Sequence, residues 1–129
     1  MGLVAALFVA FTSALQCVVL YAALTGPPSV GTALGLLLGG FWTALGLILP
    51  RVRRNPWVGV RTPWTLSSDE NWARTHRFAG FTFCFGGVLA MLCTLTGSAG
   101  LGTAIVVASA LVPAVYSFVL ARRLPPEGA

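Results

Sequence analysis

The chain has 129 residues, of which 57% are hydrophobic and only 9% are charged. Soluble globular domains carry about 25% charged residues, so this composition excludes an ordinary soluble domain. The formal net charge is +5, and every basic residue apart from the single His is an Arg. Because these Arg residues flank long apolar runs, we interpret the charge as a signal of membrane topology and expect no nucleic-acid partner.

The first apolar run covers residues 3–24 and predicts a transmembrane helix. About 22 helical residues rise roughly 33 Å, which is enough to cross a hydrocarbon core of about 30 Å. Gln16 lies within this run, and because a buried amide needs a hydrogen-bond partner, we expect it to face another helix; the alternative is a contact with a ligand. The segment from Thr25 to Ser29 then breaks the helix, and Ser29 is expected to cap the next one.

The second run covers residues 30–49 and ends at Pro50. Three glycines in it, Gly31, Gly35 and Gly39, recur at four-residue spacing and therefore share one face of the predicted helix. Small residues at this spacing let helix backbones approach closely in lipid. We favour packing against another helix of the same chain, and the alternative is a seam between two copies in a homo-oligomer.

Two further apolar runs, residues 78–96 and 101–121, complete a single all-α membrane domain over residues 1–129. The prediction is four transmembrane helices arranged as two hairpins, with both termini on the same side as the central segment 51–77. All eight Arg residues fall in that segment or directly after the last run, whereas the other two loops carry no charge. The positive-inside rule then places the termini and the central segment in the cytoplasm.

The first part of the central segment is predicted to be irregular. Pro and Gly recur through residues 54–66 and disfavour a helix there. Arg61 lies between Gly59 and Pro63, where a rigid turn can aim its guanidinium group at a carboxylate such as Glu70 or at a partner.

The second part of the central segment is predicted to begin a helix. Ser67 and Glu70 fit a capping box, so we predict one helix over about residues 68–96, continuous with the third apolar run. Helical spacing places Trp72 and His76 one turn apart, where their rings can stack.

No catalytic or metal-binding constellation stands out. His76 is the only His, and all three cysteines lie inside apolar runs, so we predict no metal, no cofactor and no enzymatic activity. We interpret His76 as a structural hydrogen bonder and expect Glu70 and Arg74 to form an ordinary i,i+4 pair. One competing interpretation is a lipid-headgroup binder or membrane enzyme that uses Arg61, His76 and Glu70. Another is a structural membrane subunit.

Residues 54–80 resemble the signature of the SdpI family of membrane immunity proteins. The shared pattern is an Asn, then Gly-Val-Arg-Thr-Pro, Thr-Leu, a Ser, Glu-x-Trp, and a His-Arg pair followed by a Gly. In this chain the pattern is supplied by Asn55, Gly59, Val60, Arg61, Thr62, Pro63, Thr65, Leu66, Ser67, Glu70, Trp72, His76, Arg77 and Gly80. Fuller members of the family carry a further membrane region before the signature.

The resemblance implies a multi-pass protein of the bacterial cytoplasmic (inner) membrane that protects the producing cell from a secreted peptide toxin. Besides membrane lipids, it implies two partners, the peptide toxin and a cytoplasmic repressor that is held at the membrane. We expect residues 54–80 to form a docking or gating surface with Arg61 and Trp72 as its anchors. The candidate binding residues are Asn55, Gly59, Arg61, Thr62, Pro63, Glu70, Trp72, His76 and Arg77.

Overall fold

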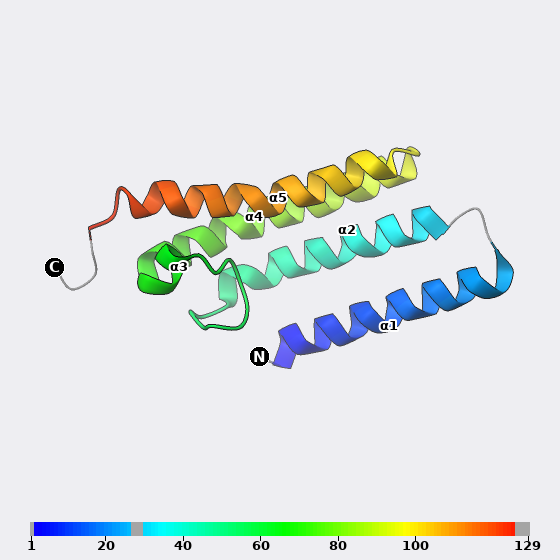
Figure 1. Ribbon diagram of the computed structural model, residues 1–129, viewed down its shortest axis with the longest axis horizontal. Coiled ribbons are helices and arrows are strands. Elements are labelled where there is room, and N and C mark those ends of the chain that lie inside the picture. The colour runs from blue at the N-terminus through cyan, green and yellow to red at the C-terminus, as the bar shows by residue number, and fades with distance from the viewer. Residues whose placement is uncertain (1, 27–29, 126–129) are drawn as a thin grey trace.

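The structure is a computed structural model that describes residues 2–26 and 30–125 (Figure 1). Within these residues, the long helices are α1 (Gly2–Thr25), α2 (Val30–Ile48), α4 (Asp69–Leu95) and α5 (Ala99–Ala121). A short 3-10 helix, η1 (Leu49–Arg51), and a short α-helix, α3 (Pro63–Ser67), lie in the central segment. All four long helices are long and apolar enough to cross a membrane. The predicted all-α integral membrane fold with four spans is therefore confirmed.

The long helices lie in the order α1, α2, α4, α5, with α1 at one edge (Figure 1). In the part of the chain described, α4 packs against both α2 and α5, whereas α1 packs only against α2. Trp42 of α2 stacks on Phe83 of α4 with 4.4 Å between the ring centroids. The Trp42 indole N–H also donates to Ser109 Oγ of α5 at 2.7 Å. One tryptophan thus joins three helices into a core that leaves α1 outside.

The helix α4 is longer than a bilayer requires. Its 27 residues rise about 40 Å, whereas a hydrocarbon core is about 30 Å thick. The first turns contain the polar residues Asp69, Glu70 and Arg74, so the extra length belongs to this end. The predicted continuity of this helix with the third apolar run is confirmed.

The start of α4 differs from the prediction. Ser67 is the last residue of α3, and its hydroxyl donates to the Trp64 carbonyl oxygen. Ser68 is the N-cap instead, because its Oγ accepts the Asn71 N–H at 3.2 Å. The predicted capping box of Ser67 and Glu70 is therefore wrong. The physical reason is that Ser68 adopts extended backbone, with φ of −142° and ψ of 122°, and so separates α3 from α4.

The irregular part of the central segment is shorter than predicted. The helix α3 begins at Pro63, and its N-cap Thr62 forms a capping box with Thr65. The prediction of no helix through residues 54–66 is therefore wrong from Pro63 onward. Pro fits the first position of a helix, where the backbone needs no N–H donor, so this Thr-Pro pair starts a helix. Ser29, which was expected to cap α2, lies outside the described residues.

Two of the three glycines predicted to share a face of α2 pack against α4. A Cβ atom on Gly39 would lie 2.7 Å from the carbonyl oxygen of Gly87, and one on Gly87 would lie 2.5 Å from that of Gly39. Gly35 lies against Thr94, whereas nothing lies within 4 Å of a Cβ on Gly31. Packing within the chain occupies the face at Gly35 and Gly39, so a seam between copies cannot use these two positions.

Gln16 does not face another helix of this chain, contrary to the expectation. It is exposed on α1, and its side chain makes no hydrogen bond with the described residues. The reason is that α1 has a single neighbour: it contacts α2 through rings such as Phe11, which stacks on Phe41 at 4.2 Å. Gln16 lies on the other side of the helix.

Replacing Gly39 by Ala should destabilise the bundle, whereas replacing the neighbouring Gly40 by Ala should not. The new methyl group at position 39 would collide with the Gly87 backbone, and such overpacking costs about 1–3 kcal/mol. Nothing lies within 4 Å of a Cβ on Gly40, and Ala is the better helix former by up to about 1 kcal/mol. Thermal unfolding of the two purified variants in detergent measures the difference. Equal melting temperatures would contradict the close α2–α4 contact.

The start of α1, the central segment and the end of α5 lie at one end of the bundle (Figure 1). All eight Arg residues belong to this end, because they lie in the central segment, in the first turns of α4 or directly after α5. The turn around Gly97, between α4 and α5, lies at the opposite end. The structure therefore gathers the Arg residues at one end of the bundle.

We expect the Arg-rich end to face the cytoplasm, as the positive-inside rule predicts. In a variant without the native cysteines, a single cysteine at Ser98 should react with a membrane-impermeant maleimide added to intact cells. A single cysteine at Ser67 should react only after the membrane is permeabilised. Both positions are exposed in the structure. Labelling of Ser67→Cys in intact cells would show that the Arg-rich end faces the outside of the cell, which is the reverse of the predicted topology.

Candidate functional site

The side chain of His76 fixes the loop between η1 and α3. Its Nε2 accepts the Val60 N–H at 3.0 Å, and its Nδ1 lies 2.9 Å from the Trp72 carbonyl oxygen. Since Nε2 acts as an acceptor, the ring is neutral and Nδ1–H donates to the carbonyl. His76 is only 1% exposed, and both of its nitrogens hold backbone groups.

Gly59 allows the loop to approach this ring. Its φ of +124° is a conformation that residues with a side chain rarely adopt. A Cβ atom at this position would also overlap Nε2 of His76. The backbone conformation and the available space therefore both require glycine, and Gly59 contributes to the site through the shape of the loop.

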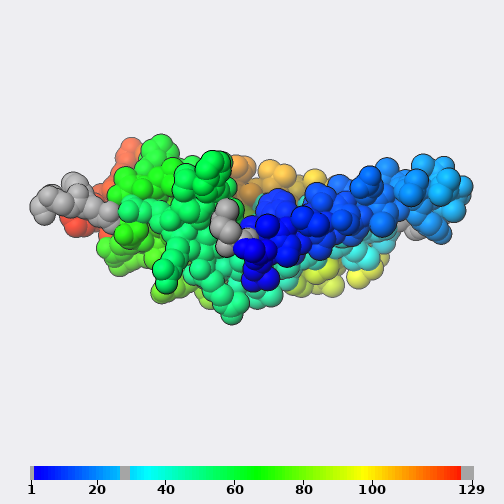
Figure 2. Space-filling model, turned by 90° about the horizontal axis from the view of Figure 1, so that it is seen from below, coloured from blue at the N-terminus to red at the C-terminus, as the bar shows by residue number. Residues whose placement is uncertain are grey.

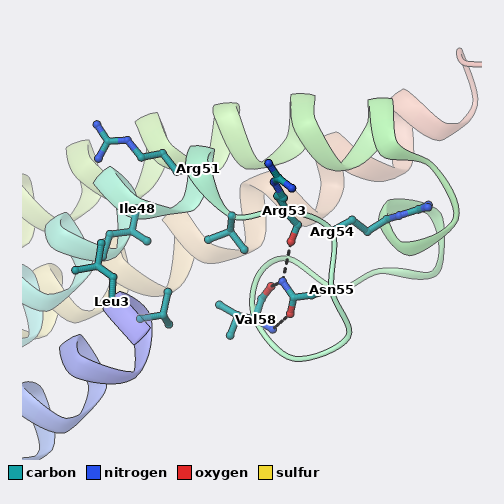
Figure 3. A pocket seen from close by; sticks show the side chains of 9 residues that line it. Leu3, Ile48, Arg51, Arg53, Arg54, Asn55 and Val58 are labelled. Atoms are coloured by element: carbon teal, nitrogen blue, oxygen red, sulfur yellow. Dashed lines mark hydrogen bonds between the residues drawn. The ribbon is translucent and has the colours of Figure 1, made fainter. Parts of the chain in front are cut away.

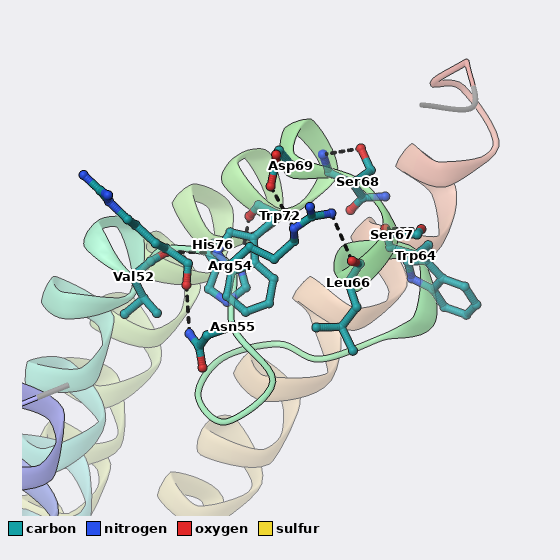
Figure 4. A network of polar contacts seen from close by, with 12 residues as sticks. Val52, Arg54, Asn55, Trp64, Leu66, Ser67, Ser68, Asp69, Trp72 and His76 are labelled. Atoms are coloured by element: carbon teal, nitrogen blue, oxygen red, sulfur yellow. Dashed lines mark hydrogen bonds and ion pairs between the residues drawn. The ribbon is translucent and has the colours of Figure 1, made fainter. Parts of the chain in front are cut away.

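Trp72 is buried, which makes its predicted role as an exposed anchor wrong. Only 3% of its surface is exposed. Its ring stacks on His76 with 4.0 Å between the centroids, which confirms the predicted stacking one helical turn apart. Its indole N–H donates to the Val52 carbonyl oxygen at 2.8 Å (Figure 4). Trp72 is unavailable to a partner because the fold uses both its ring face and its N–H.

Arg54 and Asn55 shape the beginning of the loop (Figure 4). The Arg54 guanidinium group pairs with Asp69 at 2.8 Å, which ties the loop to the first turn of α4. Asn55 Oδ1 accepts the backbone N–H groups of Trp57 and Val58, each at 2.8 Å. These are the hydrogen bonds of an Asx turn, in which a side chain replaces a backbone acceptor. The loop is therefore tied to α4 at Arg54 and given its turn by Asn55.

Four buried polar residues, none of which was a predicted site residue, connect the loop and α4 to α5. They are Thr65, Asn71, Thr75 and Ser117. Asn71 Nδ2 donates to the Ser117 carbonyl oxygen at 3.0 Å, and Thr75 Oγ1 donates to Asn71 Oδ1 at 2.9 Å. The Trp64 indole N–H donates to Ser117 Oγ at 2.6 Å. The signal in the sequence was Ser117 itself, a hydroxyl in an apolar run that can accept hydrogen bonds from another element while it donates to the Ala114 carbonyl oxygen of its own helix.

The remaining predicted site residues divide into two groups, those that help to build the fold and those that are exposed on its surface. Thr62 and Pro63 begin α3 and so belong to the scaffold. Arg61, Glu70 and Arg77 are exposed. The Arg77 side chain makes no hydrogen bond or ion pair with the described residues.

Arg61 does not reach Glu70. Its Nη1 donates to the Pro56 carbonyl oxygen at 2.6 Å, within the same loop. Glu70 pairs instead with Arg74 at 2.5 Å, which confirms the predicted i,i+4 pair. Of the two expected targets of Arg61, Glu70 is therefore wrong, because each side chain has a partner on its own segment, and a binding partner stays a prediction.

A hollow of about 390 Å³ lies between the first turn of α1 and the loop (Figure 3). Its walls include the apolar side chains of Leu3, Ile48 and Val58. Figure 3 shows the guanidinium groups of Arg51 and Arg53 pointing away from these side chains. The hollow therefore combines an apolar wall with polar lining residues, among them Arg54 and Asn55.

A second hollow, of about 320 Å³, is lined mainly by aromatic and aliphatic side chains. Phe8, Trp42 and Phe83 come from three different helices, and Trp57 and Arg61 come from the loop. Trp57 is 74% exposed and Arg61 is also exposed. Two of the side chains that the loop exposes thus border an aromatic hollow.

These features define a multi-pass membrane protein in which a folded loop closes one end of the helices. The family model described as the SdpI/YfhL protein family matches residues 51–117, which is more than half of the chain. The chain belongs to this family, which confirms the resemblance seen in residues 54–80. The matched segment contains the loop, α3, α4 and the α5 residue Ser117 that binds Trp64. Comparison with curated proteins found no match, and comparison with solved structures found none.

Replacing His76 by Phe should loosen the loop. Phe keeps a ring that can stack on Trp72 but cannot accept the Val60 N–H, and an unsatisfied buried donor costs about 1–3 kcal/mol. We expect a lower melting temperature in detergent and faster hydrogen exchange of the Val60 amide. Arg77→Gln, one residue further on and exposed, is the control and should behave as wild type. Unchanged exchange at Val60 in His76→Phe would contradict the role of His76 in holding the loop.

Proposed function

We propose that this protein is a membrane receptor of the immunity type, which protects its cell from a peptide toxin and docks a partner on its cytoplasmic face. Membership of the SdpI/YfhL family supports a membrane protein of this type. The four apolar helices and the Arg-rich end support a position in the bacterial cytoplasmic membrane. The proposed partners are the peptide, a cytoplasmic repressor and membrane lipids.

The division of the central segment 51–77 into buried and exposed residues carries this proposal. His76, Trp72 and Asn55 use their polar groups to hold the loop. Trp57 and Arg61 are exposed on that loop, and the Trp57 side chain makes no hydrogen bond with the described residues. Trp and Arg are the residues that most often dominate protein interfaces. A loop already fixed in shape also loses little conformational entropy on binding.

The same division disfavours the enzyme interpretation that uses Arg61, His76 and Glu70. His76 is buried and neutral, with both ring nitrogens bonded to backbone groups. Glu70 is paired with Arg74, and Arg61 is bonded within its own loop. A general acid or base must reach the proton that it transfers, and this His cannot do so without opening the loop. We therefore propose a binding role for the signature and no catalytic one.

Replacing Trp57 by Ala should abolish protection while the protein stays folded. A sensitive bacterial host would express the wild type or Trp57→Ala and be exposed to the secreted peptide encoded beside the gene for this chain. We expect host survival to fall at least about tenfold for Trp57→Ala, since losing a dominant interface residue costs about 2 kcal/mol or more. Membrane abundance and melting temperature should remain at wild-type values, because the Trp57 ring is mostly exposed.

Trp72→Ala is the matched control, because it removes a side chain that the fold itself needs. Its ring is buried and bonded to Val52, so abundance and protection should fall together. If Trp57→Ala also loses abundance in step with protection, the loop surface is structural and the docking proposal fails. If the wild type gives no protection and turns over a lipid or peptide in a reaction that requires His76, the enzyme interpretation replaces the immunity one.

A further inference from the structure

Gln16 places a polar amide on the lipid-facing side of α1. It is exposed and makes no hydrogen bond with any residue in 2–26 or 30–125. The residue lies about 14 Å along the helix from Thr25 and about 21 Å from Gly2, so its side chain cannot reach either membrane surface. Hydrocarbon supplies no hydrogen-bond partner, and the amide is therefore costly in lipid until another protein group meets it.

Gln16 belongs to a continuous seam along α1. The seam residues are spaced alternately by four and three positions, and all of them are exposed: Gly2, Ala6, Val9, Ser13, Gln16, Leu20 and Ala23. This spacing is the a/d pattern of two helices packed along their length. Four of the seven are Gly, Ala or Ser, which permit close approach of helices in lipid.

The seam lies opposite the side of α1 that packs on α2. The buried or half-buried residues of α1 include Val4, Phe11 and Val18, and helical geometry places them on the opposite face from the seam. Figure 2 is viewed from the side where α1 lies, and it shows this helix in front with no other described segment over it. The seam is therefore available along the length of the helix.

We propose that α1 packs against α1 of a second copy of this chain, with the two Gln16 side chains hydrogen-bonded to each other. Copies of one membrane protein insert with the same orientation, so a two-fold axis along the membrane normal brings each seam residue opposite its own equivalent. A Gln amide contains both a donor and an acceptor, so two Gln16 side chains at the same depth satisfy each other. A single polar residue in such a seam also fixes the register.

This pairing leaves the rest of the fold unchanged. The α2–α4–α5 core does not use the seam, and Gly35 and Gly39 remain packed against α4. A different partner would have to present its own polar group at the depth of Gln16, whereas a second copy supplies one by symmetry. The seam on α1 thus replaces the glycine face of α2 as the contact between copies.

Cysteine cross-linking tests which face of α1 contacts the second copy. The full chain, with its three native cysteines replaced by Ala, would be placed at high dilution in phosphatidylethanolamine–phosphatidylglycerol vesicles. Leu20→Cys should form a disulfide-linked dimer on mild oxidation, and Tyr21→Cys should stay monomeric. The two positions are 59% and 60% exposed but lie about 100° apart around the helix. Equal cross-linking of the two variants, or none in either, would overturn the proposal.

The strength of association tests the role of the amide. Energy transfer between two labelled populations in the same vesicles would give the dissociation constant. We expect Gln16→Leu to weaken association about threefold to thirtyfold, and Gln16→Asn, which keeps an amide, to weaken it less. At dilutions where the chain is monomeric, the melting temperature should not change, because the Gln16 side chain has no hydrogen-bond partner among residues 2–26 and 30–125. Absence of transfer in the wild type, or wild-type affinity in Gln16→Leu, would refute pairing through Gln16.

Discussion

The hydrogen bond from the Val60 backbone N–H to Nε2 of His76 determines how the central segment folds. The Val60 carbonyl oxygen accepts the Thr65 hydroxyl at 2.7 Å, so both backbone polar groups of this residue are satisfied by side chains. A segment without regular structure at the edge of a bilayer needs such partners, because neither a helix nor a sheet supplies them. Two neighbouring residues support this hydrogen bond. Gly59 leaves room for the His76 ring, and Trp72 stacks on that ring.

The fold has two structurally different parts, the α2–α4–α5 core and the helix α1. The α2–α4–α5 core is joined by Trp42 and by the close contact of Gly39 with Gly87. The matched family segment, residues 51–117, covers the loop together with α4 and most of α5. The helix α1 touches only α2 in the described chain and carries the one amide without a partner. The segment matched by the family model and the unpartnered Gln16 amide therefore lie on different helices.

Much of the fold was predictable because it depends on local properties. Length and hydropathy of a run decide whether a helix can cross a bilayer, and the stacking of Trp72 on His76 follows from helical periodicity. The burial of Trp72 was not predictable in this way, because it is covered by a loop that begins some 20 residues earlier. The expectation for Gln16 failed for a different reason. An amide in an apolar run needs a hydrogen-bond partner, but the sequence does not say which chain provides that partner.

The exact start of α4 could not be predicted from the sequence for a third reason. Ser67 and Ser68 are adjacent and equally able to cap a helix, so composition cannot choose between them. The choice is made by α3, which begins at Pro63 and runs through Ser67, leaving Ser68 as the first residue with extended backbone. Because α3 itself is held by the Trp64 bond to Ser117, a contact with α5 selects the cap of α4.

The uninterrupted length of α4 has a mechanical consequence. From Asp69 to Leu95 the helix contains no proline and no break, so it behaves as a stiff rod whose two ends move together. One end adjoins the turn at Gly97, on the far side of the bundle, and the other carries the ring that holds the loop. A ligand that tilted the rod at the Gly97 end would displace the loop held by His76, about 30 Å away along the helix, with no intermediate conformational change required.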